Sequence, residues 1–207
     1  IGSGDLASRG TVDAELVERL TTLDGVDEAD GVVEGSGRIL AADGSPIGGQ
    51  GPPTTATNWL GDSPVNPWAL AEGRAPLDVP AGQPYEVVID RASADTGDLE
   101  VGDRTIVQTP APTDVVIVGL ATFGGVDSLG PTTFTAFTAD AATELVGRPD
   151  QLSSIRIAAA DGLSQEALRT EIAAALPAGT EAITGAQLTA EMMDDIESDF
   201  LGMFEMI

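Results

Sequence analysis

The chain lacks several residues on which enzymes and secreted proteins commonly depend. Its 207 residues include no cysteine, which excludes disulfides, thiolate nucleophiles and thiolate metal ligands. They include no histidine either, which removes the commonest general base and metal ligand. No stretch approaches the roughly 18–20 apolar residues that a membrane-spanning helix needs, and no signal peptide is present. If the chain acts outside the cytoplasm, we expect a segment upstream of Ile1 to carry it there.

Lysine is also absent, so all nine basic residues are arginines, against 34 acidic ones, and the net charge is −25. This composition fits a GC-rich genome or a salt-adapted surface. A field of this sign repels the phosphates of nucleic acids and anionic lipid headgroups, so we expect neither as a partner. It also opposes self-association, so the chain is predicted to be a monomer at low salt.

Short motifs that resemble catalytic or cofactor sites fail their structural tests. Ser36 lies in Gly35-Ser36-Gly37, which lacks the outer glycines of a nucleophile elbow and is typical of a turn or bulge. Residues 2–7 match a dinucleotide fingerprint by letter, but no strand precedes them. Neither motif therefore predicts an active site.

The carboxylates are numerous enough to make pairs by chance. Asp27-Glu28-Ala29-Asp30-Gly31 resembles part of a calcium loop, but Val26 would occupy the first ligand position, which leaves at most weak Ca²⁺ binding. Asp194, Asp195, Glu197 and Asp199 share one helical stretch, where a solvated face is favoured over a glycosidase acid pair. We therefore predict no catalytic, cofactor-binding or metal-binding residues.

The first third of the chain predicts a helix followed by a strand. Thr11 is a candidate cap for a helix that runs to about Leu23, with Gly25 as its stop. A strand is expected over residues 32–40, and Asp43-Gly44 is typical of a hairpin turn.

The middle of the chain predicts an irregular loop followed by a β-rich block. Residues 51–84 are rich in glycine and proline, and Trp59 and Trp68 are expected to attach this loop to the core. Residues 85–147 predict a small barrel or sandwich with its own core. Its expected strands are 85–90, 104–108, 115–120 and 133–137, with short helices at 92–96 and 139–146.

The last third repeats the pattern of the first. A strand is expected over 152–159, a helix capped by Ser164 follows, and a second strand is expected over 180–184. Leu16 and Leu20 correspond in spacing to Leu168 and Ile172, a weak pseudo-repeat. Two such units commonly pack their helices on one face of a shared sheet, as in split βαβ folds.

The chain ends in an apolar helix for which the sequence contains no stop. Thr184 and Gln187 form a capping box. From there the apolar residues recur at helical spacing: Leu188, Met192, Ile196, Phe200, Met203 and Ile207. Because the chain also opens at Ile1 rather than at a methionine, we expect a segment of a longer protein.

These elements predict an α+β protein. Residues 1–84 are expected to hold the first half of a porter-like split βαβ lobe and the irregular loop. Residues 85–147 form an inserted β-barrel or sandwich subdomain. Residues 148–207 complete the lobe and add the terminal helix.

Four groups of residues, taken in order, resemble a known family. They are Ala71-Glu72-Gly73-Arg74-Ala75-Pro76, Glu86-Val87-Val88-Ile89-Asp90-Arg91, Leu99-Glu100-Val101-Gly102-Asp103 and Val116-Ile117-Val118-Gly119. The series resembles the extracytoplasmic core domain of FtsX-like and MacB-like ABC transporter permeases, particularly actinobacterial ones. Leu152-Ser153-Ser154-Ile155-Arg156-Ile157 and Thr184-Gly185-Ala186-Gln187 are similar to the second half of that domain.

The resemblance implies a mechanical role at the outer side of the cell membrane. In that family the domain sits between two membrane helices, the permease forms pairs, and separate subunits bind ATP inside the cell. The helix over residues 188–204 would transmit movement, with the residues before Thr11 as its antiparallel neighbour. An extracellular substrate or partner would respond; its identity is not implied.

Two other functions remain open from the residues. An acidic soluble extracellular binding or adaptor module would require a basic partner surface and a natural chain end near Ile207. An acid-pair hydrolase would require a cleft that joins distant carboxylates. No ATP-binding motif occurs in the chain, so any ATPase activity would belong to another subunit.

Overall fold

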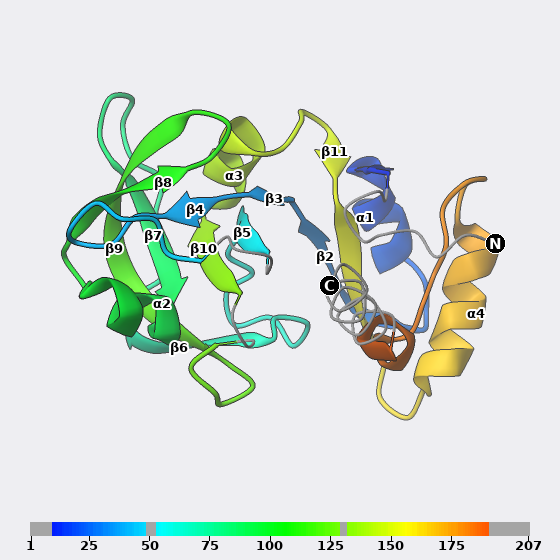
Figure 1. The fold of residues 1–207 in the computed structure, drawn as a ribbon. Helices are drawn as coiled ribbons and strands as arrows, with labels where there is room; N and C mark the ends of the chain where they lie inside the picture. The colour runs from blue at the N-terminus through cyan, green and yellow to red at the C-terminus, as the bar shows by residue number, and fades with distance from the viewer. Residues whose placement is uncertain (1–9, 49–52, 129–131, 191–207) are drawn as a thin grey trace, which may run out of the picture.

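The computed structural model describes residues 10–48, 53–128 and 132–190, which form two lobes side by side (Figure 1). The chain starts in an α/β lobe, crosses into a β-rich lobe after β2 and returns after α3. The fold is therefore α+β, as predicted, and the curled sheet is inserted in the sequence between the two halves of the smaller lobe.

The α/β lobe is built from both halves of the chain. β2 (Val26–Val32) pairs antiparallel with β12 (Ser154–Ala159). β1 (Val12–Asp13) pairs in the same sense with β11 (Gln151–Leu152). Helix α1 (Glu15–Thr21) precedes β2, and α4 (Gln165–Ala175) follows β12.

Leucines and isoleucine from the two helices make the core of this lobe. Leu16 and Leu20 of α1 and Leu168 and Ile172 of α4 are between 2% and 5% exposed and form one cluster. Each such side chain contributes about 1.5–3 kcal/mol by leaving water. The four residues matched by spacing in the sequence thus meet in space.

The start of α1 differs from the prediction. Residues 12–13 are extended because they pair with β11, so the helix begins at Glu15, and Asp13 Oδ1 accepts the Glu15 N–H at 3.1 Å. Thr11 caps nothing and donates to Gln151 Oε1 at 2.7 Å. The helix also ends at Thr21 rather than Leu23, before it reaches Gly25.

The start of α4 agrees with the prediction, but the strand expected after it is absent. Ser164 Oγ accepts the Ala167 N–H at 3.2 Å. Residues 180–184 lie in neither a helix nor a strand, and β2 pairs with β12 instead. Thr184 is used otherwise, because it forms the predicted capping box: its N–H donates to Gln187 Oε1 at 2.9 Å, and its Oγ1 accepts the Gln187 N–H at 3.2 Å.

The β-rich lobe is one curled sheet with the strand order β3-β5-β10-β7-β9-β8-β4, and β6 also pairs with β9. Helices α2 and α3 follow β7 and β10. Strands β3 to β6 come from residues before 85, outside the range expected for the inserted subdomain. The bounds are β3 (Glu34–Ser36), β4 (Arg38–Ile39), β5 (Thr54–Asn58), β6 (Trp68–Gly73), β7 (Tyr85–Asp90), α2 (Arg91–Gly97), β8 (Arg104–Gln108), β9 (Pro112–Phe123), β10 (Thr133–Phe137) and α3 (Ala139–Leu145).

The sheet curls into a barrel because its two end strands are consecutive in the chain. β3 pairs with β5, β4 pairs with β8, and only Gly37 separates β3 from β4. A Cβ on Gly37 would lie 2.4 Å from the Ala56 Cβ, so a larger residue does not fit at this corner. The strand expected over residues 32–40 is therefore divided here, and Ser36 lies in β3. The expected turn at Asp43-Gly44 does form, with Gly44 at a φ of 82° and a bridge from Leu40 to Pro46.

The interior of the barrel is fully buried. The run predicted to be covered on both faces is buried in β9 from Ile117 to Ala121. The side chains with no exposure come from most of the strands and include Ile39, Val87, Ile89, Val107, Val115, Ile117 and Phe137. This core also takes in Val33, Ile39, Ile47 and Ala56, which precede the range 85–147 expected for the inserted subdomain.

Residues 51–84 contain two strands that the sequence analysis assigned to a loop. β5 is rich in threonine, a β-branched residue that suits strands, and its parallel partner β10 lies about eighty positions away. β6 has no alternating pattern and forms because β9 offers it an edge. The tryptophans do attach this region to the core, and the Trp68 ring stacks on Phe134 with centroids 3.9 Å apart.

Candidate functional site

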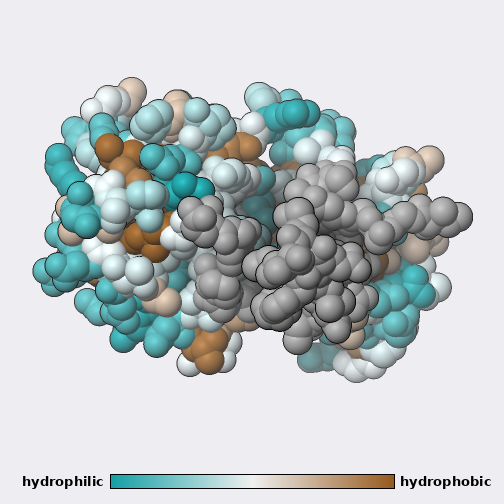
Figure 2. All heavy atoms as spheres, viewed as in Figure 1, coloured by the Kyte–Doolittle hydropathy of each residue, from teal (hydrophilic) through white to brown (hydrophobic). Residues whose placement is uncertain are grey.

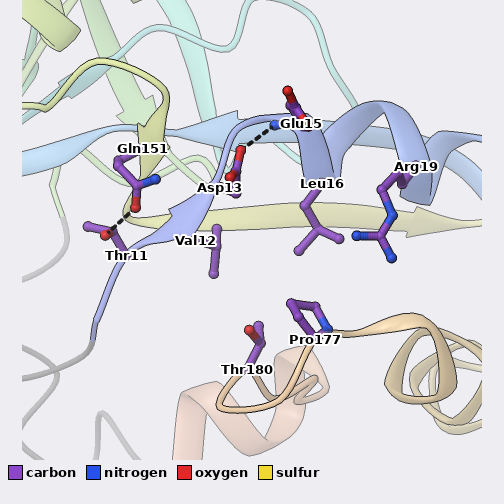
Figure 3. Close-up of a pocket in the computed structure, with 9 residues that line it drawn as sticks. All are labelled: Thr11, Val12, Asp13, Glu15, Leu16, Arg19, Gln151, Pro177 and Thr180. Atoms are coloured by element: carbon purple, nitrogen blue, oxygen red, sulfur yellow. Dashed lines mark hydrogen bonds between the residues drawn. The ribbon is translucent and has the colours of Figure 1, made fainter.

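A pocket of about 350 Å³ in the α/β lobe lies between the first residues of the described chain and the turn that follows α4. Its wall comes from the segment that opens the lobe, from α1, from β11 and from the turn that follows α4 (Figure 3). We refer to it as the α1 pocket. It is lined by Thr11, Val12, Asp13, Glu15, Leu16, Arg19, Gln151, Pro177 and Thr180.

Hydrogen bonds across long sequence separations form this pocket. Thr11 bonds to Gln151, and the Ala14 N–H donates to the Asp150 carbonyl at 3.0 Å, which holds the start of the chain against β11. Arg19 Nη2 donates to the Ala175 carbonyl at 3.1 Å and so connects α1 to the end of α4. Sequence reasoning missed this site because its partners lie about 140–156 positions apart.

The α1 pocket combines charged side chains with one apolar residue of the lobe core. Its wall carries two carboxylates, Asp13 and Glu15, and one guanidinium, Arg19, around the core residue Leu16. A nucleophile with a base in hydrogen-bond reach is the usual signature of covalent catalysis, and these side chains do not supply one.

The chain leaves the α/β lobe through the capping box described above. Thr184 is 6% exposed, and residues 185–190 are helical. The helix expected over residues 188–204 and the carboxylates Asp194, Asp195, Glu197 and Asp199 fall mostly or wholly outside the described residues. So do residues 2–7 and the chain termini.

The acidic motif at Asp27-Glu28-Ala29-Asp30-Gly31 lies in β2 rather than in a loop. Side chains two positions apart in a strand share a face, so Glu28 and Asp30 lie on the same side, where Asp30 accepts a hydrogen bond from the Ser63 hydroxyl at 2.5 Å. Within the described residues, no group of three or more acidic side chains is arranged to hold a metal ion. The calcium-loop geometry is therefore not formed.

A second pocket, of about 220 Å³, gathers carboxylates on the barrel. The carboxylates on its wall are Asp78, Glu86, Asp140 and Glu144. Glu86 accepts two bonds from Arg74, at 2.5 and 2.6 Å, and one from the Leu77 N–H at 2.9 Å. The bonds from Arg74 are the main reason that the pKa of Glu86 lies below its usual value.

A hydrolase needs a carboxylic acid that stays protonated, and a lowered pKa works against that role. Asp78 is also engaged, because it accepts a hydrogen bond from the Thr138 hydroxyl. Burial raises the pKa of Tyr85, and the neighbouring Glu144 adds to the shift. The pocket therefore gives little support to an acid-pair enzyme.

Asp90 is a fully buried carboxylate that sequence reasoning did not single out. Its Oδ1 accepts the Ser93 N–H at 2.8 Å, and its Oδ2 accepts the Ser93 hydroxyl at 2.6 Å and the Phe134 N–H at 2.8 Å. Burial raises the pKa of Asp90, and these hydrogen bonds oppose the shift. The residue caps α2 and ties it to β10, a structural role that the Asp-x-x-Ser spacing after a strand could have indicated.

The surface of both lobes is mainly hydrophilic on the face shown in Figure 2, where hydrophobic residues form small separate patches. Large apolar side chains that are exposed include Leu70, Leu77 and Val126, at 39%, 62% and 57%. Among the described helices, none combines the length and apolarity required to cross a membrane.

Two solved structures share this fold. The extracellular domain of the noncanonical ABC-type transporter YknZ from Gram-positive bacteria has a TM-score of 0.54 at 14% identity, with 82% of this chain and 84% of that chain covered. The periplasmic region of MacB from Actinobacillus actinomycetemcomitans has a TM-score of 0.57 at 9% identity, with 88% and 83% covered. At these identities the likeness concerns the fold alone.

The sequence itself identifies the family. No curated protein matches the chain at a significant level. The model of the MacB-like periplasmic core domain matches residues 2–175, so it spans both lobes and confirms the resemblance seen in the short motifs. The chain therefore belongs to the family of MacB-like periplasmic core domains, the extracytoplasmic domains of MacB-like ABC transporter permeases.

Proposed function

We propose that this domain converts movement of its two chain ends into a change that an extracellular substrate or partner detects. The observation that carries the proposal is the α1 pocket, which is lined both by the incoming segment around Thr11 and by the outgoing segment around Thr180 (Figure 3). Force applied to either segment reaches the same four-residue core, because Leu16 lines the pocket and belongs to that core.

The force would come from the membrane part of the full permease. Separate ATP-binding subunits inside the cell would drive it, and a second copy of the permease would complete the transporter. The helix over residues 188–204, which starts at the capping box, would be the moving element, with the residues before Thr11 beside it. The barrel would then be the part that meets the substrate or partner.

The charge of the domain limits which partners are suitable. A net charge of −25 repels nucleic acids and anionic lipids and favours a partner with a basic surface. We propose no catalytic role for the domain; the lowered pKa of Glu86, which Arg74 causes, works against its use as a general acid. An acidic adaptor module without a membrane part is the competing function.

A cross-linking experiment on the full permease tests the proposal. These 207 residues contain no cysteine, so in a permease whose remaining cysteines are replaced, Thr11→Cys and Thr180→Cys can be introduced together and joined with a short bismaleimide. We expect the cross-link to abolish transport or partner activation, since the ends can no longer shift. Each single variant and the double variant treated with a monofunctional maleimide serve as controls and should remain active.

Two results would contradict the proposal. One is a cross-linked permease with full activity. The other is a full-length protein that lacks flanking apolar helices and does not associate with an ATPase, which would favour the adaptor function.

A further inference from the structure

The chain passes between the two lobes at two places, and these lie against each other. The first crossing is Val33, between β2 and β3, and the second is the segment that joins α3 to β11 (Figure 1). A Cβ on Gly147 would come within 2.7 Å of Val33 Cγ1, and one on Gly35 within 2.8 Å of Val146 Cβ. The two crossings therefore touch with no space for side chains between them.

Asn58, the last residue of β5, holds the first crossing from the barrel side. Its Oδ1 accepts the Val33 N–H at 2.8 Å, and its Nδ2 donates to the Gly31 carbonyl at 3.0 Å. Its own N–H donates to the Val33 carbonyl at 3.3 Å. One side chain that is 7% exposed thus binds backbone groups of the α/β lobe and of the crossing point together.

Ser153 holds the same crossing from the α/β side. Its N–H donates to the Val32 carbonyl at 2.7 Å, and its hydroxyl accepts the Glu34 N–H at 2.9 Å and donates to the Glu34 carbonyl at 3.1 Å. We refer to Val33, Asn58, Ser153 and Gly147 as the lobe junction.

A hinge needs a few residues whose backbone angles are free to change. At the lobe junction such a change would leave buried backbone groups without partners, which is costly. We propose that the lobe junction locks the two lobes into one rigid body, with Asn58 as its main positioning residue. This inference rests on the proposed function and deepens it, since movement at the α1 pocket then reaches the barrel without being absorbed between the lobes.

Distance measurements between spin labels test this lock on the 207-residue chain. Thr96→Cys on α2 and Ala174→Cys on α4 are exposed positions in different lobes and outside the lobe junction. We expect one narrow distance distribution for the otherwise unchanged chain. Asn58→Ala should raise the population of other lobe orientations roughly tenfold or more, since two buried backbone groups lose their partner.

The other asparagine of the chain provides a matched control. Asn66 also makes two side-chain bonds to backbone, to the Gly61 carbonyl and the Trp68 N–H, but both lie within its own loop. Asn66→Ala should leave the distribution unchanged. If Asn58→Ala fails to fold, Ser153→Ala removes only the two hydroxyl bonds to Glu34 and should broaden the distribution to a smaller extent.

Each outcome decides the inference. A broad distribution in the otherwise unchanged chain, equal effects of Asn58→Ala and Asn66→Ala, or no effect of both Asn58→Ala and Ser153→Ala would overturn it. In the full permease, Asn58→Ala should lower transport while ATP hydrolysis continues. The spin-label distances measure rigidity between the lobes in the 207-residue chain alone. The inference of a rigid lobe junction can therefore be disproved while the cross-linking test still supports the proposed function.

Discussion

The two lobes differ in how they are held together. The barrel surrounds a core of side chains with no exposure, contributed by most of its strands. The α/β lobe has two small sheets of two strands each and a buried core of four side chains from two helices. Regions with few buried contacts open at lower free energy. We therefore expect the α/β lobe to deform more easily than the barrel, which is the more stable of the two lobes.

The largest expected effect concerns the barrel core. Phe137→Ala should lower the free energy of unfolding by about 3–5 kcal/mol, because it removes a fully buried ring and leaves a cavity. Urea unfolding followed by tryptophan fluorescence measures this, since both tryptophans pack on the barrel. Val126→Ala, at a position 57% exposed, should change little. Equal effects of the two variants on the free energy of unfolding would contradict the claim that the buried core stabilises the barrel.

A core substitution in the α/β lobe tests whether this lobe is less stable than the barrel. Leu20→Ala should cost about 2–4 kcal/mol and cause the helical circular dichroism signal to fall at lower urea than the tryptophan signal. Glu18→Ala, at an exposed position of the same helix, is the control. If both signals still change together, the lobes unfold as one unit and do not differ in stability as argued.

The cap of α4 offers a smaller test within the α/β lobe. Ser164→Ala removes the acceptor of the Ala167 N–H and should cost about 1 kcal/mol. The loss should appear in the helical signal and leave the tryptophan transition in place. Thr170→Ala, on the exposed side of α4, should not reproduce it. A shift of the tryptophan transition by Ser164→Ala alone would show that the barrel depends on the α/β lobe.

The smallest effect is a pH dependence confined to the barrel. Arg74 and the Leu77 N–H keep the pKa of Glu86 below its ordinary value of 4.5. The ionised carboxylate therefore adds stability above that pH, and the contribution is lost as the pH falls through the lower pKa of the folded state. Glu86→Gln should reduce the stability of the barrel at neutral pH and have no effect in strong acid. Glu72→Gln on β6 is the control, and a constant difference at all pH values would contradict the assignment.

The parts of the structure that the sequence predicted well depend on neighbours along the chain. The cap at Ser164, the capping box at Thr184 and the turn at Gly44 each involve groups within three to six positions. The apolar spacing of Leu16, Leu20, Leu168 and Ile172 identified the core of the α/β lobe because helical periodicity is local. The absence of histidine and cysteine limited the possible chemistry before any fold was known.

The errors have a common cause in long-range pairing. Thr11 is a reasonable cap by its type, but the two residues that follow it pair with β11, and its hydroxyl bonds to Gln151 instead. β6 shows no strand pattern and exists because β9 supplies a partner. The strand expected over residues 180–184 does not form, and β2 pairs with β12.

By itself, the sequence determined the acidic, histidine-free character of the domain, the caps at Ser164 and Thr184 and the apolar faces that had to be buried. Only the tertiary structure decided that the two chain ends share the α1 pocket, that one glycine closes the barrel, and that Asn58 holds both lobes. The physical reason is that these contacts join residues from about twenty to more than a hundred positions apart, and the free energy that selects among such pairings comes from the whole packed fold.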